Sequence, residues 1–309
     1  MAKSKRFKKV YCEISGGCNF SCDFCPLAHD NHNFTQSFMK KSTFLRVLDQ
    51  LAPLTERLYF HIMGEPLLHP QFNEYIELCE QAGVTVHLVT NGALINEETV
   101  KGLLNPIVQE INFSLQSFAG SYGEDADDTA YLQRIFEFID LAQKERPDVY
   151  INLRLWNLDG YEEARTSNYK MLQKIYAHFG LEVPEFKVGK RIHGRSVPVS
   201  GVTYVNFSTR FAWPSMKLPE MRTTGYCMGL MTQLGVHNDG TVVPCCLDDN
   251  AEINLGNLIE SDINEILAGH RAKEMFDGFQ KEILTEDLCK RCAFGARFKK
   301  RVRVRGKRI

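Results

Sequence analysis

The stretch that decides the fold runs from residue 10 to residue 25 and reads VYCEISGGCNFSCDFC. Val10–Ile14 is a short run typical of a buried strand, and a glycine-containing loop follows it. That loop carries Cys18, Cys22 and Cys25 in the pattern Cys-x3-Cys-x2-Cys, which can surround one compact centre. Because a [4Fe–4S] cluster needs a ligand at each iron, three cysteines would leave one iron open to a small molecule.

Neighbouring residues in this loop leave two interpretations open. Phe24, directly before the last cysteine, could shield a cluster from solvent. The three thiols could instead form a zinc site, completed by a histidine such as His29 or His32. The spacing favours the cluster over zinc.

Short apolar runs alternate with helical patterns over the first 190 residues. The runs mostly lack polar alternation, as buried parallel strands do. The predicted strands are Val10–Ile14, Leu58–Ile62, Val84–Thr90, Glu110–Leu115, Val149–Leu155 and Pro184–Val188. The predicted helices are Thr43–Ala52 with Ser42 as its cap, Gln71–Gln81, a helix from the N-cap Asn96 to Leu104, Tyr131–Lys144 and Glu162–Phe179. Repeated strand–helix units predict an α/β fold with a parallel sheet, open or barrel-like.

The pattern changes after about residue 190. Residues 191–226 contain three prolines and no clear period, which predicts a linker. Asn238-Asp239-Gly240 then gives a hairpin signal. The strands of that hairpin and two short helices after it are predicted at Leu234–His237, Thr241–Val243, Ser261–Gly269 and Arg271–Phe279.

Four further cysteines form a second set. Cys227 is followed by twelve residues, a glycine, four residues and Cys245, and Cys289-x2-Cys292 comes later. The hairpin would bring the first two together, and the later pair would close a four-thiolate site. Such a set can bind an iron–sulfur cluster or, as in a zinc ribbon, a zinc ion.

Five more cysteine and histidine residues could bind a metal or react, but we do not assign them to a site. In an extended segment Cys246 would point away from Cys245, so it ranks below Cys245 as a ligand. Cys12 and Cys79 are expected to be core thiols. His61 and His87 lie on predicted strands and could face either the barrel interior or packing contacts.

Taken together, these motifs resemble the radical S-adenosylmethionine superfamily, whose signature is Cys-x3-Cys-x-aromatic-Cys after the first barrel strand. Met63-Gly64-Glu65-Pro66 is similar to the family's Gly-Gly-Glu-Pro segment, with Met63 in place of the first glycine. The resemblance implies a partial (β/α)6 TIM-like barrel over residues 1–190. It places cofactor contacts at the carboxyl ends of the strands, here Phe24, Gly64, Glu65, Pro66, Asn91, Ser114, Gln116, Arg154 and Asn157.

The resemblance also implies the chemistry. A [4Fe–4S] cluster on Cys18, Cys22 and Cys25 would bind S-adenosylmethionine and reduce it, giving a 5′-deoxyadenosyl radical that abstracts hydrogen from a substrate. Glu65 would receive the cofactor's amino group, although it could also cap a helix or be a surface acid. Arg154 would contact the cofactor, or else form a buried ion pair that closes the barrel mouth.

The second cysteine set resembles the SPASM and Twitch extensions of the same superfamily. This implies a small cysteine-rich hairpin-and-helix domain over residues 227–309. Its auxiliary [4Fe–4S] cluster would be bound by Cys227, Cys245, Cys289 and Cys292. A fully ligated cluster cannot bind substrate without losing a ligand, so we expect it to accept an electron, which makes the net reaction an oxidation.

The composition and the charge distribution limit the class of protein and its expected location in the cell. The 309 residues are 44% hydrophobic and 24% charged, which excludes disorder and fits a globular protein. The net charge of -1 hides an uneven distribution, because residues 290–309 hold ten basic side chains and no acid. No run reaches the roughly 20 apolar residues of a spanning helix, and no signal peptide is visible. We therefore expect a cytoplasmic protein without membrane contact.

Substrate and partners remain open at this stage. The substrate is expected to be a small molecule or a peptide, and the electron donor a low-potential protein such as flavodoxin or ferredoxin. The basic segment Arg297–Arg308 could bind RNA phosphates, or could fold back near the auxiliary cluster. Besides an RNA- or peptide-modifying radical enzyme, the remaining alternative is a non-enzymatic zinc-binding adaptor.

Overall fold

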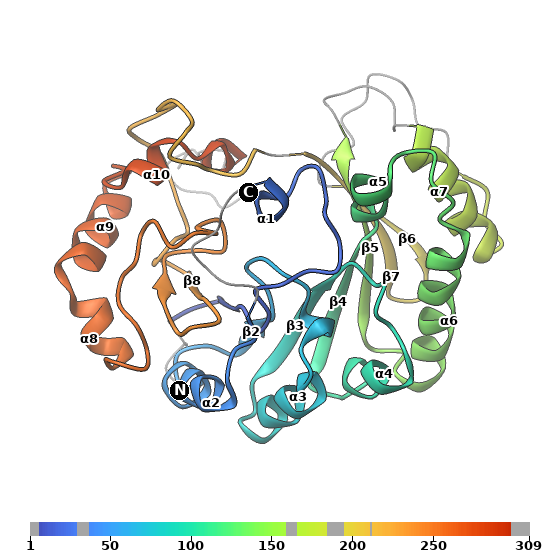
Figure 1. Ribbon diagram of the computed structural model, residues 1–309, viewed down its shortest axis with the longest axis horizontal. Helices are drawn as coiled ribbons and strands as arrows, with labels where there is room; N and C mark the ends of the chain where they lie inside the picture. Colours follow the sequence, from blue (N-terminus) through green and yellow to red (C-terminus); the bar gives the residue numbers. More distant parts are fainter. Residues whose placement is uncertain (1–5, 30–36, 159–165, 184–194, 211, 298–309) are drawn as a thin grey trace, which may run out of the picture.

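One curved sheet organises the protein. The computed structural model describes residues 6–29, 37–158, 166–183, 195–210 and 212–297. In this part of the chain nine strands pair in the order β6-β7-β5-β4-β3-β2-β1-β8-β9. Their bounds are β1 Lys9–Cys12, β2 Arg57–Tyr59, β3 Thr85–Thr90, β4 Val108–Ser114, β5 Tyr150–Leu158, β6 Arg195–Ser200, β7 Thr203–Thr209, β8 Gln233–Val236 and β9 Val242–Val243. All neighbours from β7 to β8 are parallel, whereas β6–β7 and β8–β9 are antiparallel. With β6 and β9 as separate edges the sheet stays open, a partial barrel (Figure 1).

Helices cover the outer face of this sheet (Figure 1). They are α2 Lys41–Leu51, α3 Phe72–Gln81, α4 Glu97–Leu103, α6 Thr129–Glu145 and α7 Thr166–His178, with the short α1 Pro26–His29 and α5 Gln116–Tyr122 at the barrel mouth. Asn96 is confirmed as an N-cap, because its side chain accepts hydrogen bonds from the N–H groups of Glu98 and Thr99. The prediction for Ser42 was wrong: Lys40 is the N-cap of α2, and Ser42 lies within the first turn.

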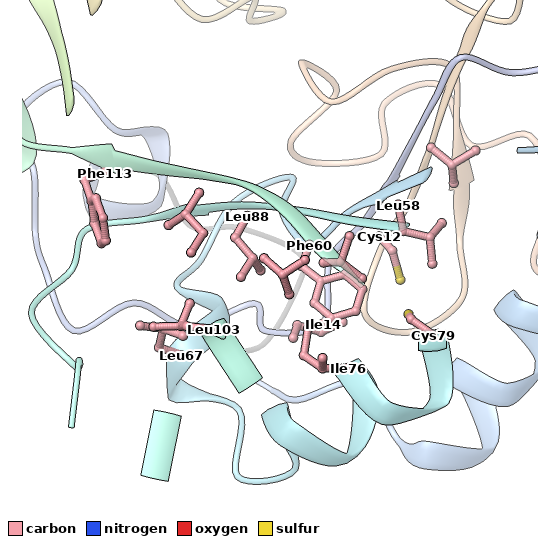
Figure 2. Packing of buried hydrophobic residues seen from close by; sticks show 14 of the residues in the cluster. Cys12, Ile14, Leu58, Phe60, Leu67, Ile76, Cys79, Leu88, Leu103 and Phe113 are labelled. Atoms are coloured by element: carbon pink, nitrogen blue, oxygen red, sulfur yellow. The ribbon is translucent and has the colours of Figure 1, made fainter. Parts of the chain in front are cut away.

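The apolar core lies between strands and helices. Alternate residues of each strand point outward into it, so that Leu88, Ile111 and Leu153 are fully buried. Cys12 of β1 and Cys79 of α3 are fully buried here as predicted, and Figure 2 shows their sulfur atoms pointing toward one another. All ten cysteines are free thiols. The other residues of each strand face the barrel interior, where the polar groups lie.

The predicted linker over 191–226 is corrected at residues 195–209. These residues form the β6–β7 hairpin, and β7 pairs parallel with β5 as the next barrel strand. Val205 and Phe207 are buried while Tyr204 and Asn206 are not, an alternation that the sequence analysis missed. Pro198 is tolerated because β6 is an edge strand. The strand predicted at Pro184–Val188 and the tail from residue 298 lie outside the described residues.

The C-terminal part continues the same sheet. The predicted hairpin is confirmed as β8–β9, with Gly240 at φ +92° in its turn. The sequence did not predict that β8 would pair in parallel with β1, from Lys9 opposite Gln233 to Cys12 opposite Val236. Beside it stand the helices α8 Ile263–Ala268, α9 His270–Gln280 and α10 Asp287–Lys290 (Figure 1). None of the helices described is long and apolar enough to cross a membrane.

A buried ion pair joins the two parts of the chain. The carboxylate of Glu13, 2% exposed, lies 3.0 Å from Nδ1 of the fully buried His237. The second carboxylate oxygen of Glu13 accepts a hydrogen bond from the N–H of Met63, and Nε2 of His237 lies 2.9 Å from the carbonyl oxygen of Asp248. Burial alone would lower the pKa of His237, but the hydrogen bond and charge of Glu13 outweigh it and raise that pKa. Protonated His237 therefore stabilises the junction.

Replacing His237 with glutamine should give a stability loss that depends on pH. A group whose pKa is raised by folding stabilises fully below its unfolded pKa, about 6.5 for histidine, and loses this contribution as pH rises through the folded value. The Tm of H237Q should therefore lie furthest below wild type at about pH 6 and approach it in alkaline buffer, as measured by calorimetry. His270→Gln, at an exposed histidine, is the control. A deficit that grows with pH would contradict a protonated His237.

Candidate active site

The first three cysteines lie in the loop between β1 and α1. The N–H of Phe20 donates to Sγ of Cys18 at 3.4 Å, and Nδ2 of Asn91 lies 3.8 Å from the same sulfur. Sγ of Cys22 lies 3.3 Å from Oγ of Ser121 in α5. Polar groups of this kind hold and tune cluster thiolates. The loop thus offers its sulfur atoms in a polar, half-buried setting that fits a cluster.

The thiols of this loop are close to one another. Burial raises the pKa of Cys18 to about 11 and that of Cys25 to about 12, and the neighbouring thiols add to both shifts. In the described part of the chain no three His, Cys, Asp or Glu side chains meet closely enough to hold a single metal ion. Nε2 of His29 lies 2.9 Å from the carbonyl oxygen of Asp23, and His32 is outside the described residues. A [4Fe–4S] cluster binds each cysteine at a different iron, so its ligands surround it.

Gly64 and Glu65 bring the loop after β2 against the cysteine loop. Gly64 has φ +62°, and a Cβ there would collide with the carbonyl oxygen of Ser15 and lie 2.9 Å from that of Gly17. The N–H of Glu65 donates to the same Gly17 oxygen at 2.8 Å. Pro66 begins a short 3-10 turn, η1 Pro66–Leu68. The tight contact explains why glycine is needed at this position.

The Glu65 carboxylate is 2% exposed and fully engaged. It accepts hydrogen bonds from Oγ1 of Thr90 at 2.7 Å, from the N–H of Asn91 at 2.7 Å and from the N–H of Leu67 at 3.0 Å. Burial raises the pKa of Glu65 to about 7 despite these donors. Glu65 therefore caps η1, as the helix-capping alternative predicted, and it ties the ends of β2 and β3 together; it is not a surface acid.

Three other predicted cofactor contacts lie at the carboxyl ends of the strands, as Glu65 does. Nδ2 of Asn91 donates to Oδ1 of Asn19 at 2.8 Å, which fixes it beside the cysteine loop. Ser114 ends β4, and Gln116 begins α5 with its Oε1 accepting from the N–H of Trp156. All three lie where parallel strands end, the edge at which such folds bind ligands.

Phe24 and Asn157 occupy different surroundings. The ring of Phe24 has the guanidinium of Arg210 5.4 Å from its centroid, and a Cβ at Gly120 would lie 2.8 Å from that ring. Asn157 exchanges two amide hydrogen bonds with Asn168 of α7, at 3.0 and 2.7 Å. Phe24, which belongs to the cysteine loop, thus packs against α5. Asn157 is turned toward α7 and away from the other predicted cofactor contacts.

Arg154 lies on the inner face of the sheet, opposite Ser114 in the register of β4 and β5. Its guanidinium lies 4.4 Å from the centroid of the Trp156 ring, and it makes no ion pair with any described residue, so the predicted ion pair across the mouth is not found. Burial lowers the pKa of Arg154 to about 10. The sequence analysis gave no role to the polar groups around it: Tyr11, Tyr59, His61, His87 and Glu110.

The second set of cysteines comes together from three segments. Cys227 precedes β8, Cys245 follows β9, and Cys289 and Cys292 lie in and after α10. Burial raises the pKa of Cys245 and of Cys289 well above the usual value, and Cys227 adds to both shifts. Cys292 acts on Cys227 and Cys289 in the same way, so the four thiols are neighbours. They fit a four-cysteine cluster site.

Cys246 also lies close to this set, because burial and then the charge of Cys246 raise the pKa of Cys245, and Cys292 acts on Cys246; its lower rank as a ligand stays a prediction. Cys246 is hydrogen-bonded to Tyr11, and it packs against the same buried group of side chains as Cys25. That group, here named the junction cluster, consists of Tyr11, Tyr59, Ile62, Met63 and Val243. Close by, a cavity of about 670 Å³ is lined by Phe24, Cys25, Arg210, Trp213, Asp249 and further residues of these segments.

Comparison with known proteins decides the family. Residues 12–165 match the family model described as the radical SAM superfamily, and residues 227–293 match the SPASM model, described as an iron-sulfur cluster-binding domain. The chain belongs to the radical SAM superfamily. It is therefore an enzyme that uses a [4Fe–4S] cluster and S-adenosylmethionine, and its SPASM domain binds auxiliary iron–sulfur. This excludes the non-enzymatic zinc adaptor.

Two curated relatives are similar in sequence to this chain over part of their length. A tungsten-containing aldehyde ferredoxin oxidoreductase cofactor-modifying protein of Pyrococcus furiosus is 31% identical over 110 residues, 35% of this chain and 30% of that protein. An S-adenosyl-L-methionine-dependent 2-deoxy-scyllo-inosamine dehydrogenase of Niallia circulans is 25% identical over 164 residues, 48% of this chain and 63% of that protein. The matches thus span less than two thirds of either relative.

Solved radical SAM structures share the fold. BtrN in complex with AdoMet and 2-DOIA aligns with a TM-score of 0.59 at 18% identity, over 94% of both chains. Streptococcus suis SuiB bound to its precursor peptide SuiA aligns with a TM-score of 0.59 at 13% identity, over 93% of this chain and 70% of SuiB. At these identities the likeness concerns the fold.

Gly64→Ala should damage the radical SAM site. The added Cβ would push the loop after β2 away from Ser15, and 5′-deoxyadenosine formation should fall on the order of a hundredfold, the cost of misplacing a contact by about 1 Å. Gly83→Ala is a matched control, because Gly83 has φ +65° with nothing within 4 Å of the added Cβ. Equal activity of both variants in a reduced assay would show that the close approach at Gly64 is unimportant.

Substitutions of the cysteines should separate the two cluster sites by iron content. We expect about eight irons per chain from two [4Fe–4S] clusters. Cys22→Ala should lower this to about four irons and abolish 5′-deoxyadenosine formation. Cys246→Ala should retain about eight irons, since Cys246 is not placed among the ligands. Cofactor cleavage by C22A would mean that the radical centre lies elsewhere.

Proposed function

We propose that this enzyme oxidises a small polar molecule by two electrons. When bound, S-adenosylmethionine and its cluster supply a radical that removes one hydrogen atom from a substrate carbon. The substrate then loses a proton from a hydroxyl or amino group and one electron to the auxiliary cluster. An alcohol would leave as a carbonyl compound, so that two electrons and two protons are removed in total. Cys18, Cys22 and Cys25 would hold the first cluster, and Cys227, Cys245, Cys289 and Cys292 the second.

The proposal depends on how the two cysteine sets adjoin. Cys25 belongs to the first set, and Cys246 is the sequence neighbour of Cys245 in the second; both pack against the junction cluster. We infer that this shared packing brings the two sites close together. A substrate radical formed beside Cys25 would lie close to an electron acceptor at Cys245.

Cavity size favours a small molecule over a peptide. The cavity beside Cys25 has a volume of about 670 Å³, within the range of small-molecule sites. The dehydrogenase relative is named for a small aminocyclitol substrate, which agrees with this choice. A peptide substrate is the second candidate, because the similar SuiB fold was solved with a precursor peptide.

Electrons for the first cluster would come from a low-potential protein such as flavodoxin or ferredoxin. We place the reaction in the cytoplasm, where ten free thiols would stay reduced. RNA binding by Arg297–Arg308 stays a prediction, since residues 298–309 are outside the described part of the chain. Deleting residues 297–309 and titrating RNA binding with salt would test it.

Removing the auxiliary ligands should separate cofactor cleavage from substrate oxidation. In Cys289→Ala with Cys292→Ala, 5′-deoxyadenosine should still form, because the first three cysteines are intact. Substrate turnover should fall by at least about a hundredfold, since the second electron has no acceptor. The matched variant Cys246→Ala changes the thiol next to Cys245 and should retain both clusters.

The substrate itself can be sought by isotope transfer. The anaerobic enzyme is incubated with S-adenosylmethionine, reductant and deuterated candidate metabolites or peptides, and deuterium in 5′-deoxyadenosine is measured. Transfer from a small alcohol or amine, with the oxidised product in equal amount, is the expected result. Transfer from peptides alone would select the second candidate. Loss of all cofactor cleavage in the doubly substituted variant would give the second cluster a structural role.

A further inference from the structure

Two histidine nitrogens and one guanidinium on the inner face of the sheet have no hydrogen-bond partner in the described part of the chain. Nδ1 of His61 and Nε2 of His87 have no hydrogen-bond partner in the described part of the chain. The guanidinium of Arg154 makes no hydrogen bond or ion pair with any described residue. His87 is 4% exposed, so water does not replace a partner freely. More than nine in ten buried polar groups in proteins are paired, so the unpaired buried nitrogens of His61 and His87 indicate a missing ligand.

These groups converge around Tyr59. The centroid of the Tyr59 ring lies 6.0 Å from that of His61 and 4.9 Å from that of His87. The guanidinium of Arg154 lies 4.4 Å from the centroid of the Trp156 ring, and its charge acts on Tyr59, on Tyr11 and on His61. His61 directly after β2, His87 of β3 and Arg154 of β5 thus carry these groups on the inner face.

The positive charges of this region favour the binding of an anion. Arg154 is joined on the inner face by Arg57, hydrogen-bonded to Tyr59, and by Lys9, whose Nζ lies 5.4 Å from the Tyr59 ring centroid. Glu110, which lies 3.0 Å from Nδ1 of His87, contributes one negative charge, so three cations face one carboxylate in this region. The other carboxylate of the inner face, Glu13, is bound by His237.

The hydrogen-bonding capacity of these side chains also fits an anionic ligand. A guanidinium donates two parallel hydrogen bonds to a carboxylate or phosphate. Burial, Arg154 and Lys9 lower the pKa of His61 to about 3, so its ring is neutral and can donate one N–H without adding charge. Nδ1 of His87 faces Glu110, which leaves its Nε2 to accept a hydrogen bond from a hydroxyl group. The set matches a hydroxylated anion.

The site lies beside the reacting centre of the proposed function, on which this inference rests. Arg154 is paired in register with Ser114, one of the predicted cofactor contacts. Tyr11, next to His61 with ring centroids 5.3 Å apart, is hydrogen-bonded to Cys246. A group held by Arg154 and His61 would therefore lie near the predicted cofactor contact Ser114 and near Tyr11.

We propose that Arg154 and His61 bind an oxyanion of the substrate, either a carboxylate or a phosphate. His87 accepts a hydrogen bond from a hydroxyl group of the same substrate. The substrate is then a small hydroxylated anion, and Arg154 serves the substrate and not S-adenosylmethionine.

Calorimetry on the anaerobic holoenzyme tests this binding directly. Saturated with S-adenosylmethionine in a non-anionic buffer, wild type is titrated with inorganic phosphate and, separately, with acetate. Saturable binding of at least one is expected, and the tighter one identifies a phosphate ester or a carboxylate. Arg154→Gln should weaken binding roughly tenfold or more, since a hydrogen bond to a charged group contributes about that factor. Arg154→Lys should restore part of it, and His61→Gln should weaken it independently. Arg46→Gln, on the exposed side of α2, is the control.

The outcomes separate this inference from the proposed function. If R154Q loses anion binding but retains its affinity for S-adenosylmethionine and its rate of 5′-deoxyadenosine formation within about twofold, the assignment holds. If R154Q loses cofactor affinity instead, Arg154 holds the cofactor carboxylate and the inference is wrong. If wild type forms 5′-deoxyadenosine but binds neither anion, the inference fails while the proposed function stands. If wild type forms no 5′-deoxyadenosine, the proposed function fails, and the calorimetry still decides whether the anion site exists.

Discussion

A single buried carboxylate, Glu13, holds together the parts on which the chemistry depends. It follows β1 directly and binds His237 of the C-terminal hairpin with one oxygen and the N–H of Met63 with the other. Met63 in turn precedes Gly64 and Glu65, which press against the cysteine loop. Removing one partner of such a buried pair leaves an uncompensated charge and costs several kcal/mol. The relative placement of β1 and the C-terminal hairpin therefore depends on this ion pair as well as on the pairing of β1 with β8.

Local patterns predicted what local chemistry determines. The cap at Asn96 and the turn at Gly240 depend on residues a few positions apart, and each was found where expected. The pairing of β8 with β1 joins residues more than 200 positions apart, for example Cys12 and Val236, and no short pattern encodes it. Residues 195–209 were missed because Pro198 suggested a linker, although an edge strand tolerates proline.

The inner face shows a second limit of prediction. In β2 and the residues after it, Leu58 and Phe60 alternate with Tyr59 and His61, and this period of two was a usable signal. The strands were instead interpreted as apolar runs, because the outward residues dominate the composition. Which inward groups meet depends on the curvature of the sheet, and hence on all of its strands at once. Arg154 was therefore identified as important before its surroundings could be known.

The parallel ladder between β1 and β8 also constrains how the enzyme can move. Four residue pairs, from Lys9–Gln233 to Cys12–Val236, make the auxiliary hairpin part of the barrel wall. A hinge between the two cysteine-bearing parts would have to break this ladder together with the Glu13–His237 contact. The ladder and this contact together fix the start of the cysteine loop relative to the auxiliary hairpin, so that β1 and β8 must move as one unit.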